Sequence, residues 1–293
     1  MTLDQVVAEL PWGLKKRLEF IEFKLFWEGK VNRGDLQAAF KISVPQASAD
    51  LGKYQEMAPE NLAYDRSGKF YFPTQGFRPL LIKISSDYYL SKLHAISMEL
   101  VDRKSTGLSS VPPIGHNPIP PRMADANVLK AVVTAINANL KLEIFYQSMS
   151  SSEPKRRWIS PHALAFNEFR WHVRAFCHND SFYKDFVLGR IISTGGNEPN
   201  TVNATNDLDW HKIISIVISP NPKLNEFRRK VIELDYGMID GKFEIPVRIS
   251  LAKYLLQTYR LNKDTDAIPE NEQHIVLFNR DDVLKALNNK LTF

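Results

Sequence analysis

Basic and imidazole side chains recur at alternate positions of one short segment, residues 170–178. A β-strand turns successive side chains to opposite faces, so Arg170, His172, Arg174 and His178 share one face of such a strand. The other face is an expected core row of Trp171, Val173, Ala175 and Cys177. Like charges on one face repel each other unless an anion lies over them. The segment therefore predicts either a pocket for an anionic ligand or a solvated strand face.

A second group of polar and basic side chains lies between residues 43 and 69. In a predicted helix over 44–57, Val44, Ala47, Leu51 and Tyr54 form the inward face. The outward face and the hairpin that follows carry the side chains expected to contact DNA, namely Ser43, Pro45, Gln46, Ser48, Ala49, Lys53, Arg66 and Lys69. A glutamine can pair with adenine, and the three cations suit phosphates. The alternative is a domain for protein contacts, since residues 1–75 hold about as many acids as bases.

The elements that position this second group have the order helix, helix, helix, hairpin. Apolar periodicity predicts helices over 11–28, ended by Gly29, and over 33–40, capped by Asn32. Ser43 and Gln46 have the spacing of a capping box for the third helix. Residues 62–72 form a predicted hairpin with Ser67 and Gly68 near its tip. This order is typical of a winged helix-turn-helix.

The first group lies among four strand-like runs in residues 144–192. The runs are 144–148, 157–162, 170–178 and 186–191, and a helical pattern at 125–139 precedes them. Their order and spacing resemble the WYL domain, a small Sm-like β-barrel that in bacteria usually follows a winged helix-turn-helix. The resemblance covers about residues 125–215. Trp171 matches the name-giving Trp-Tyr-Leu, whereas His172 and Val173 replace the tyrosine and the leucine.

The resemblance implies a sensor of nucleic acids or nucleotides. Its ligand pocket is carried over to Tyr146, Ser148, Arg157, His162, Arg170, Trp171 and Arg190. Arginines make bidentate bonds to phosphate, and histidine switches protonation near neutral pH. His172 can also meet an anion, and the strand-face pattern adds Arg174.

The connecting and C-terminal parts complete an α+β, multidomain fold. Residues 76–101 are predicted to be helical, and 102–121, with five prolines, form an extended linker. Strands at 212–219, 243–251 and 274–278 alternate with helices at 225–234, 252–261 and 281–287. This alternation suggests a small α/β sandwich and resembles the dimerising extension of WYL regulators. The predicted domains are a winged helix-turn-helix (1–75), a helical connector and linker (76–124), a WYL domain (125–212) and a dimerisation extension (213–293).

Composition narrows the function classes. The 293 residues carry a formal net charge of +5, which favours an anionic partner only where the charge is clustered. The single cysteine excludes a disulfide framework and a zinc site built on several thiolates. We expect a cytoplasmic protein that does not associate with membranes, because no apolar run approaches the length of a membrane span. The sequence contains no nucleotide-loop, metalloprotease or esterase motif.

We therefore expect no catalytic residue, no cofactor and no metal. His162, His172 and His178 could in principle hold a metal, but the neighbouring arginines would repel it. The whole layout resembles the homodimeric repressors of the BREX and CBASS anti-phage defence systems. It implies a repressor that binds double-stranded DNA at an inverted-repeat operator and releases it when a nucleic-acid or nucleotide effector binds. The alternatives are a ligand-dependent activator of the same architecture and a nucleic-acid-processing enzyme.

Overall fold

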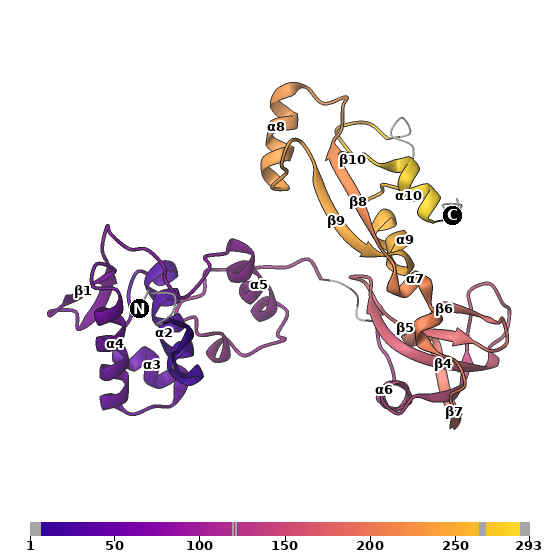
Figure 1. Ribbon diagram of the computed structural model, residues 1–293, viewed down its shortest axis with the longest axis horizontal. Helices are drawn as coiled ribbons and strands as arrows, with labels where there is room; N and C mark the ends of the chain where they lie inside the picture. Colours follow the sequence, from indigo (N-terminus) through magenta and orange to yellow (C-terminus); the bar gives the residue numbers. More distant parts are fainter. Residues whose placement is uncertain (1–6, 119, 121, 264–267, 288–293) are drawn as a thin grey trace. The chain divides into compact units, whose positions relative to one another are not determined.

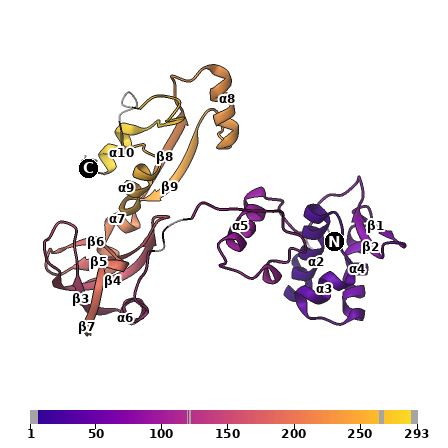
Figure 2. The same ribbon diagram turned by 180° about the vertical axis from the view of Figure 1, so that it is seen from behind.

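The computed structural model describes residues 7–118, 120, 122–263 and 268–287. The chain divides into two compact units that separate between residues 118 and 119, and each unit is described by itself (Figures 1 and 2). Within the described residues, no helix combines the length and apolar character that crossing a membrane requires.

The N-terminal unit begins with the predicted three helices and hairpin. These are α2 (Trp12–Glu28), α3 (Arg33–Phe40), α4 (Val44–Met57), β1 (Leu62–Asp65) and β2 (Phe70–Pro73). Gly29 ends α2 in the left-handed conformation that glycine adopts without strain, and Asn32 forms a capping box with Asp35. Leucines and isoleucines of α2 pack against α3 and α4 in one core. The helices and the hairpin predicted from periodicity are therefore confirmed.

The helix predicted over residues 76–101 is wrong in its first half. Only α5 (Ser86–Ser97) is helical. The backbone N–H groups of Leu80, Leu81 and Ile82 donate to the carboxylate of Glu22, at 2.6 to 2.9 Å. Glu22 is fully buried in α2, so this segment satisfies a buried charge with N–H groups that a helix would direct along its own axis.

The first part of the predicted linker also belongs to this unit. A short 3₁₀ turn, η1 (Arg103–Thr106), precedes Leu108, which is buried against Phe23 and Leu93. The N–H of Ser109 donates to Glu28 at 2.9 Å. The extended linker predicted from Asp102 onward therefore begins later, because the apolar side chain of Leu108 packs against Phe23 of α2.

The central part of the second unit is one helix and a five-stranded antiparallel sheet. The helix is α6 (Ala126–Asn137), and the strands are β3 (Leu140–Tyr146), β4 (Lys155–Phe166), β5 (Trp171–Cys177), β6 (Phe182–Val187) and β7 (Ile191–Pro199). They are ordered β6-β5-β4-β3-β7. A 3₁₀ turn, η2 (Leu188–Arg190), replaces the end of the last predicted strand. The apolar side of α6 and the sheet enclose the core.

Strand β7 was not predicted from the sequence. Its two glycines and its proline are typical of a loop. The strand forms at a sheet edge, where it pairs with β3. A Cβ atom on Gly195 would lie 2.0 Å from the Glu143 carboxylate, so a larger residue there would displace that side chain.

The C-terminal part packs helices on a three-stranded antiparallel sheet. Strands β8 (Ile213–Pro220), β9 (Phe243–Arg248) and β10 (Ile275–Leu277) are ordered β10-β8-β9. The helices are α7 (Leu208–His211), α8 (Glu226–Asp235), α9 (Ile249–Thr258) and α10 (Arg280–Ala286). The strand predicted over 243–251 stops at Arg248, and α9 begins three residues earlier than predicted. The α+β fold class is confirmed.

Candidate functional site

The residues predicted to contact DNA lie on the surface of the N-terminal unit. On α4 and its cap, these are the exposed Ser43, Pro45, Gln46, Ser48, Ala49 and Lys53, and Arg66 and Lys69 are exposed at the tip of the hairpin. The predicted inward face holds for Ala47, Leu51 and Tyr54, which are buried. It is wrong for Val44, which is 46% exposed because it lies in the first turn of α4.

Polar contacts cap α4 and connect it to α2. The Ser43 hydroxyl accepts the N–H of Gln46 at 3.3 Å, as in the predicted cap. The Gln46 side chain does not complete the capping box, since its amide donates to Asp50 at 2.9 Å. Asp50 is buried and also accepts from Arg17 at 2.6 and 3.2 Å. The second amide hydrogen and the amide oxygen of Gln46 remain for another partner.

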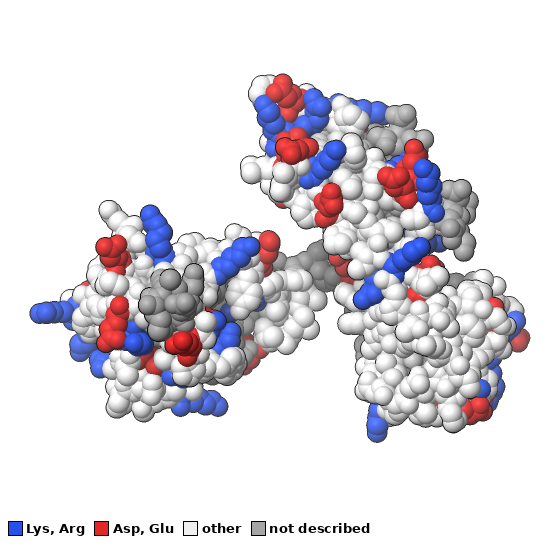
Figure 3. All heavy atoms as spheres, in the orientation of Figure 1, with Lys and Arg blue, Asp and Glu red and all other residues white. Residues whose placement is uncertain are grey.

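Burial of acids changes the charge that this unit presents. Glu22 and Asp50 are buried, and Glu28 pairs with the buried Lys24. Burial therefore removes two acids, Glu22 and Asp50, and one base, Lys24, so the surface is only slightly more basic than the count in residues 1–75 suggests. Figure 3 shows lysine and arginine side chains protruding at several places of the N-terminal unit, with acids between them.

The hairpin tip is ordered by its own hydrogen bonds. The Asp65 carboxylate accepts the N–H groups of Ser67 and Gly68 at 2.8 and 3.0 Å. Lys69 follows with a φ of 55° and an exposed side chain. The turn therefore holds Arg66 and Lys69 on a defined loop.

Strand β5 does not have the open cationic face that its alternation suggested. His172 and Arg174 are 1% and 5% exposed, because α7 and α9 cover that face. Trp171, predicted as a core residue, is 50% exposed and lies beside Phe166 at a ring distance of 4.9 Å. The core row holds for Val173, Ala175 and Cys177. The prediction for Trp171 is wrong because β5 begins at the rim of the sheet.

Arg174 and His162 are bound to buried carboxylates. Arg174 donates to Asp207 at 2.6 and 2.8 Å and to Asp185 at 3.4 Å. His162 lies 3.0 Å from Asp207. Burial alone would raise the pKa of Asp207, but hydrogen bonds from Arg174 and His162 outweigh burial and hold this pKa well below its ordinary value. In this arrangement neither side chain is free to meet the expected ligand.

Three other residues predicted to bind the ligand each bond to a different partner. Arg157 pairs with Asp180 at 2.9 Å. Tyr146 is buried, and its hydroxyl accepts the N–H of Val187 at 3.2 Å. Ser148 bonds to Ser150 in the loop after β3. The structure therefore does not gather these side chains around one cavity.

Arg170, Trp171 and Arg190 do line one cavity of about 280 Å³, which we name the arginine pocket. Arg122 lines it as well, and none of the three arginines forms an ion pair with a described residue. The rest of the lining is Met123, Ala124, Val187, Leu188 and Gly189. A Cβ atom on Gly189 would lie 2.5 Å from the Met123 carbonyl oxygen, so glycine is required for residues 122–124 to pass this turn. Unpaired arginines around a cavity are suited to a phosphate or carboxylate.

Arg122 was not among the residues predicted to bind the ligand, because it follows the last proline of the predicted linker. In the sequence it stands out only as a cation shortly before the helix predicted over 125–139. The linker brings this cation to η2, and a strand-based pattern could not show that approach.

The charges of two arginines of the arginine pocket act on the buried side chain of His172. Burial lowers the pKa of its imidazole, and the charges of Arg170 and Arg190 lower it further, against the opposing effect of Asp185. Its Nδ1 atom is buried without a hydrogen-bond partner in the described part of the chain. The ring stacks on Tyr254 of α9 at 4.9 Å. The His172 ring therefore lies between the five-stranded sheet and α9 of the C-terminal part.

No metal centre is formed by the residues that the structure describes. Among them, no three histidine, cysteine, aspartate or glutamate side chains converge.

Comparison with known families assigns all three parts of the chain. The winged helix-turn-helix domain of the BrxR transcriptional regulator matches residues 13–95, the WYL domain matches residues 127–194, and the BrxR C-terminal dimerization domain matches residues 213–283. Among solved structures, the proteasome accessory factor B/C of Arthrobacter aurescens is 14% identical with a TM-score of 0.29. The match covers 93% of this chain and 45% of that one. So low a score adds nothing about the fold.

Curated relatives cover nearly the whole chain. The DNA-binding transcriptional repressor CapW of Escherichia coli (strain KTE188) is 36% identical over 94% of this chain and 92% of its own length. The proteins of the same name from Stenotrophomonas maltophilia and Pseudomonas aeruginosa are 34% and 35% identical, over 94% and 93% of this chain and 93% and 91% of their own lengths. These names agree with the expectation of a regulator that is not an enzyme. At this identity and coverage, the chain belongs to the family of the CapW DNA-binding transcriptional repressors.

Proposed function

We propose that this protein is a homodimeric transcriptional repressor that binds operator DNA through α4 and the hairpin. A phosphate-bearing effector, a nucleic acid or a nucleotide, binds the arginine pocket and releases the DNA. The observation that carries the proposal is the cavity lined by Arg122, Arg170 and Arg190 without a paired carboxylate. Three cations held together without counter-charges repel each other, and an anionic ligand relieves that repulsion.

DNA binding is supported by the surface of α4. Small side chains such as Ser48 and Ala49 let a helix approach base edges, and Gln46 keeps an amide hydrogen and its oxygen for adenine. Lys53, Arg66 and Lys69 surround that face with cations for phosphates. The relatives' name adds support, since those proteins are described as DNA-binding repressors.

Dimer formation is supported by an apolar stripe on α8. Phe227, Val231 and Leu234 recur at helical spacing and are 79%, 63% and 83% exposed. Exposed apolar side chains at this density mark an interaction surface. The stripe lies in the part that matches the C-terminal dimerization domain. A twofold dimer presents two α4 helices and therefore favours an inverted-repeat operator.

The regulated promoter, we further propose, belongs to an anti-phage defence operon. The support is the layout of winged helix, WYL domain and dimerization domain, which resembles the repressors of such systems.

Gel-shift with the DNA upstream of the protein's own gene tests the repressor half. We expect a band that is sequence-specific and weakens with salt. A reporter driven by that DNA should rise when the protein's gene is deleted. Absence of a specific band would refute DNA binding, and a fall of the reporter would show activation instead.

The double variant Arg170→Ala/Arg190→Ala tests the effector half. It should bind operator DNA as the wild type does but fail to release it during phage infection. Arg156→Ala is the matched control, because Arg156 is an arginine of the same sheet with 74% of its side chain exposed and lies outside the pocket. Normal release by the double variant would refute the arginine pocket as the effector site.

A further inference from the structure

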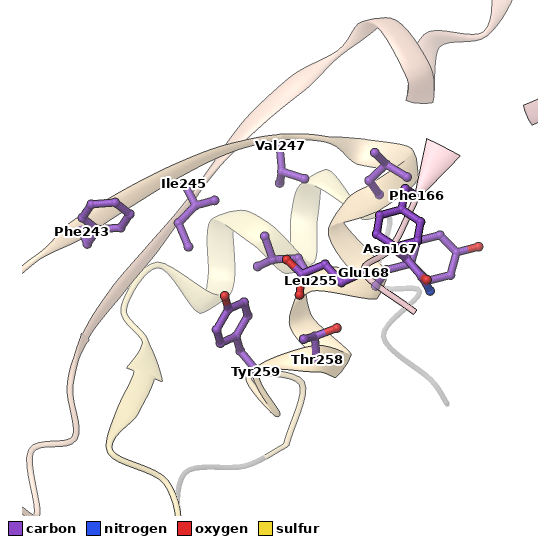
Figure 4. A pocket seen from close by; sticks show the side chains of 11 residues that line it. Phe166, Asn167, Glu168, Phe243, Ile245, Val247, Leu255, Thr258 and Tyr259 are labelled. Carbon is purple, nitrogen blue, oxygen red and sulfur yellow. The ribbon is translucent and has the colours of Figure 1, made fainter. Parts of the chain in front are cut away.

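A second cavity is lined by Phe166, Asn167 and Glu168, which precede Arg170 in the same turn. Its volume is about 360 Å³, and we name it the aromatic pocket. Its rings are Phe166 at the end of β4, Phe243 on β9, and Tyr254 and Tyr259 at α9. Figure 4 shows the β9 and α9 side chains around the cavity, with residues 166–168 entering from the sheet of the WYL domain.

Residues that line the two pockets contact each other. Phe166 of the aromatic pocket contacts Trp171 of the arginine pocket, with 4.9 Å between ring centroids. Tyr254 of the aromatic pocket stacks on His172, whose pKa responds to Arg170 and Arg190. The turn between Phe166 and Trp171 is tight, since the N–H of Asn167 donates to the carbonyl oxygen of Arg170. The two cavities are thus lined by residues of the same turn, Asn167 and Glu168 in the aromatic pocket and Arg170 in the arginine pocket.

Two polar side chains of that turn line the aromatic pocket without being used up by the fold. The Asn167 Oδ1 atom accepts the N–H groups of Phe169 and Arg170 at 3.2 and 3.0 Å, so its Nδ2 atom is left to donate. Glu168 has no hydrogen bond or ion pair with a described residue, and Figure 4 shows its side chain between Leu255 and Thr258. The turn therefore adds one free donor and one carboxylate to the stacking surfaces of the pocket.

We propose that the two pockets are compartments of one site, in which the aromatic pocket takes a guanine base and the arginine pocket takes the attached phosphate. A carboxylate only accepts, and guanine is the common base that presents two adjacent N–H donors beside a carbonyl acceptor. Glu168 accepts from the two donors, and Asn167 donates to the carbonyl oxygen. Aromatic rings stack on the base faces. The proposal rests on the proposed function and names the class of its effector.

A small cation is the other ligand that rings and a carboxylate would recognise. Arg170 lies in the same turn as Glu168 and repels a cationic ligand. A nucleotide instead places negative charge at the arginines and a neutral base among the rings. The arginines beside the aromatic pocket therefore favour the nucleotide.

Calorimetric titration of the full-length protein with GMP, CMP and ribose 5-phosphate tests the base compartment. Ribose 5-phosphate carries the phosphate without a base. We expect GMP to bind at least roughly fivefold more tightly than ribose 5-phosphate, from base stacking, and more tightly than CMP. Glu168→Gln should remove the preference for GMP over CMP.

Thr258→Trp fills the aromatic pocket from a partly exposed position. It should reduce GMP affinity to that of ribose 5-phosphate and leave ribose 5-phosphate binding unchanged. Gln257→Trp, an exposed neighbour on α9 outside the lining, is the matched control. An unchanged thermal midpoint and unchanged operator binding show that both variants fold.

Different results would refute the base compartment, the guanine assignment and the effector site. If GMP and ribose 5-phosphate bind equally and Thr258→Trp has no effect, the base compartment is refuted and the arginine pocket stands. Tighter binding of CMP than of GMP refutes the guanine assignment. If none of the three compounds binds and Arg190→Ala changes nothing in phage-triggered release, the effector part of the proposed function fails as well.

Discussion

Arg174, in the middle of β5, and Arg170, in the turn before that strand, belong to one alternating row of the sequence but to different regions of the molecule. Arg174 lies in a buried network in which Asp207 and Asp185 accept its hydrogen bonds. Arg170 lines the arginine pocket with Arg122 and Arg190, and none of them is paired with a described residue. The partners of a charge, rather than its place in a row, therefore distinguish a residue that stabilises the fold from one that can bind a ligand.

The largest expected difference between the two regions is in the free energy of unfolding after an arginine is replaced. Arg174→Ala leaves the carboxylate of Asp207 buried without its main donor, and we expect a loss of about 3 to 5 kcal/mol in the free energy of unfolding. Urea denaturation followed by circular dichroism measures it. Arg190→Ala, in the arginine pocket, should change the free energy of unfolding by less than about 0.5 kcal/mol. Similar losses for both variants would remove the distinction.

Ligand binding should show the opposite order. Arg190→Ala removes charge-assisted hydrogen bonds to phosphate, worth about 1.5 to 3 kcal/mol, and should weaken effector binding by roughly 10- to 150-fold. Titration with GMP at low salt measures the effect. A change at Arg157, which is paired with Asp180 outside the pocket, should leave the affinity close to that of the wild type.

Tyr254 connects the buried network to the C-terminal part, so its hydroxyl should have an intermediate effect. Tyr254→Phe removes the hydrogen bond to Asp185, 2.9 Å long, and keeps the ring that stacks on His172. We expect a loss of about 1.5 kcal/mol in unfolding free energy, since the acceptor is charged. Thermal unfolding measures it, and an unchanged midpoint would show that this bond does not couple the two parts.

Acid should weaken the buried network and not the arginine pocket. The pKa of Asp207 is lower in the folded protein than its ordinary value of 3.8. The stability from this group is therefore complete above about pH 4 and is lost as the pH falls below that value toward the folded pKa. Urea midpoints between pH 7 and pH 3 measure the loss. Asp207→Asn should flatten this part of the profile, and Asp209→Asn, at an exposed neighbour, should not.

The smallest effect concerns a cation of the DNA-binding unit. Lys53→Ala should reduce the slope of log affinity against log salt by about 1 and weaken binding to all sequences alike. Gel-shift at several salt concentrations measures the slope. Lys155→Ala, an exposed lysine of β4, is the control. A change of sequence preference in Lys53→Ala would show instead that this lysine reads bases.

Much of the fold could be predicted because local signals agree with it. Asn32, Gly29 and Ser43 mark helix ends through bonds to near neighbours in the chain, and alternation located β5. Strand β7 and residues 76–85 could not be predicted in this way. Pairing with β3 and the demand of the buried Glu22 carboxylate come from residues far away in the chain.

For the candidate site, the sequence was enough to predict a WYL-like sheet rich in cations. Which of these cations are neutralised depends on the folded structure, since Asp207 and Asp185 reach Arg174 from other elements. It also brought Arg122 from the linker to Arg190 and placed Trp171 at the rim rather than in the core. The physical reason is that ion pairing and burial depend on distances in space, and alternation along one strand carries no information about what covers either face.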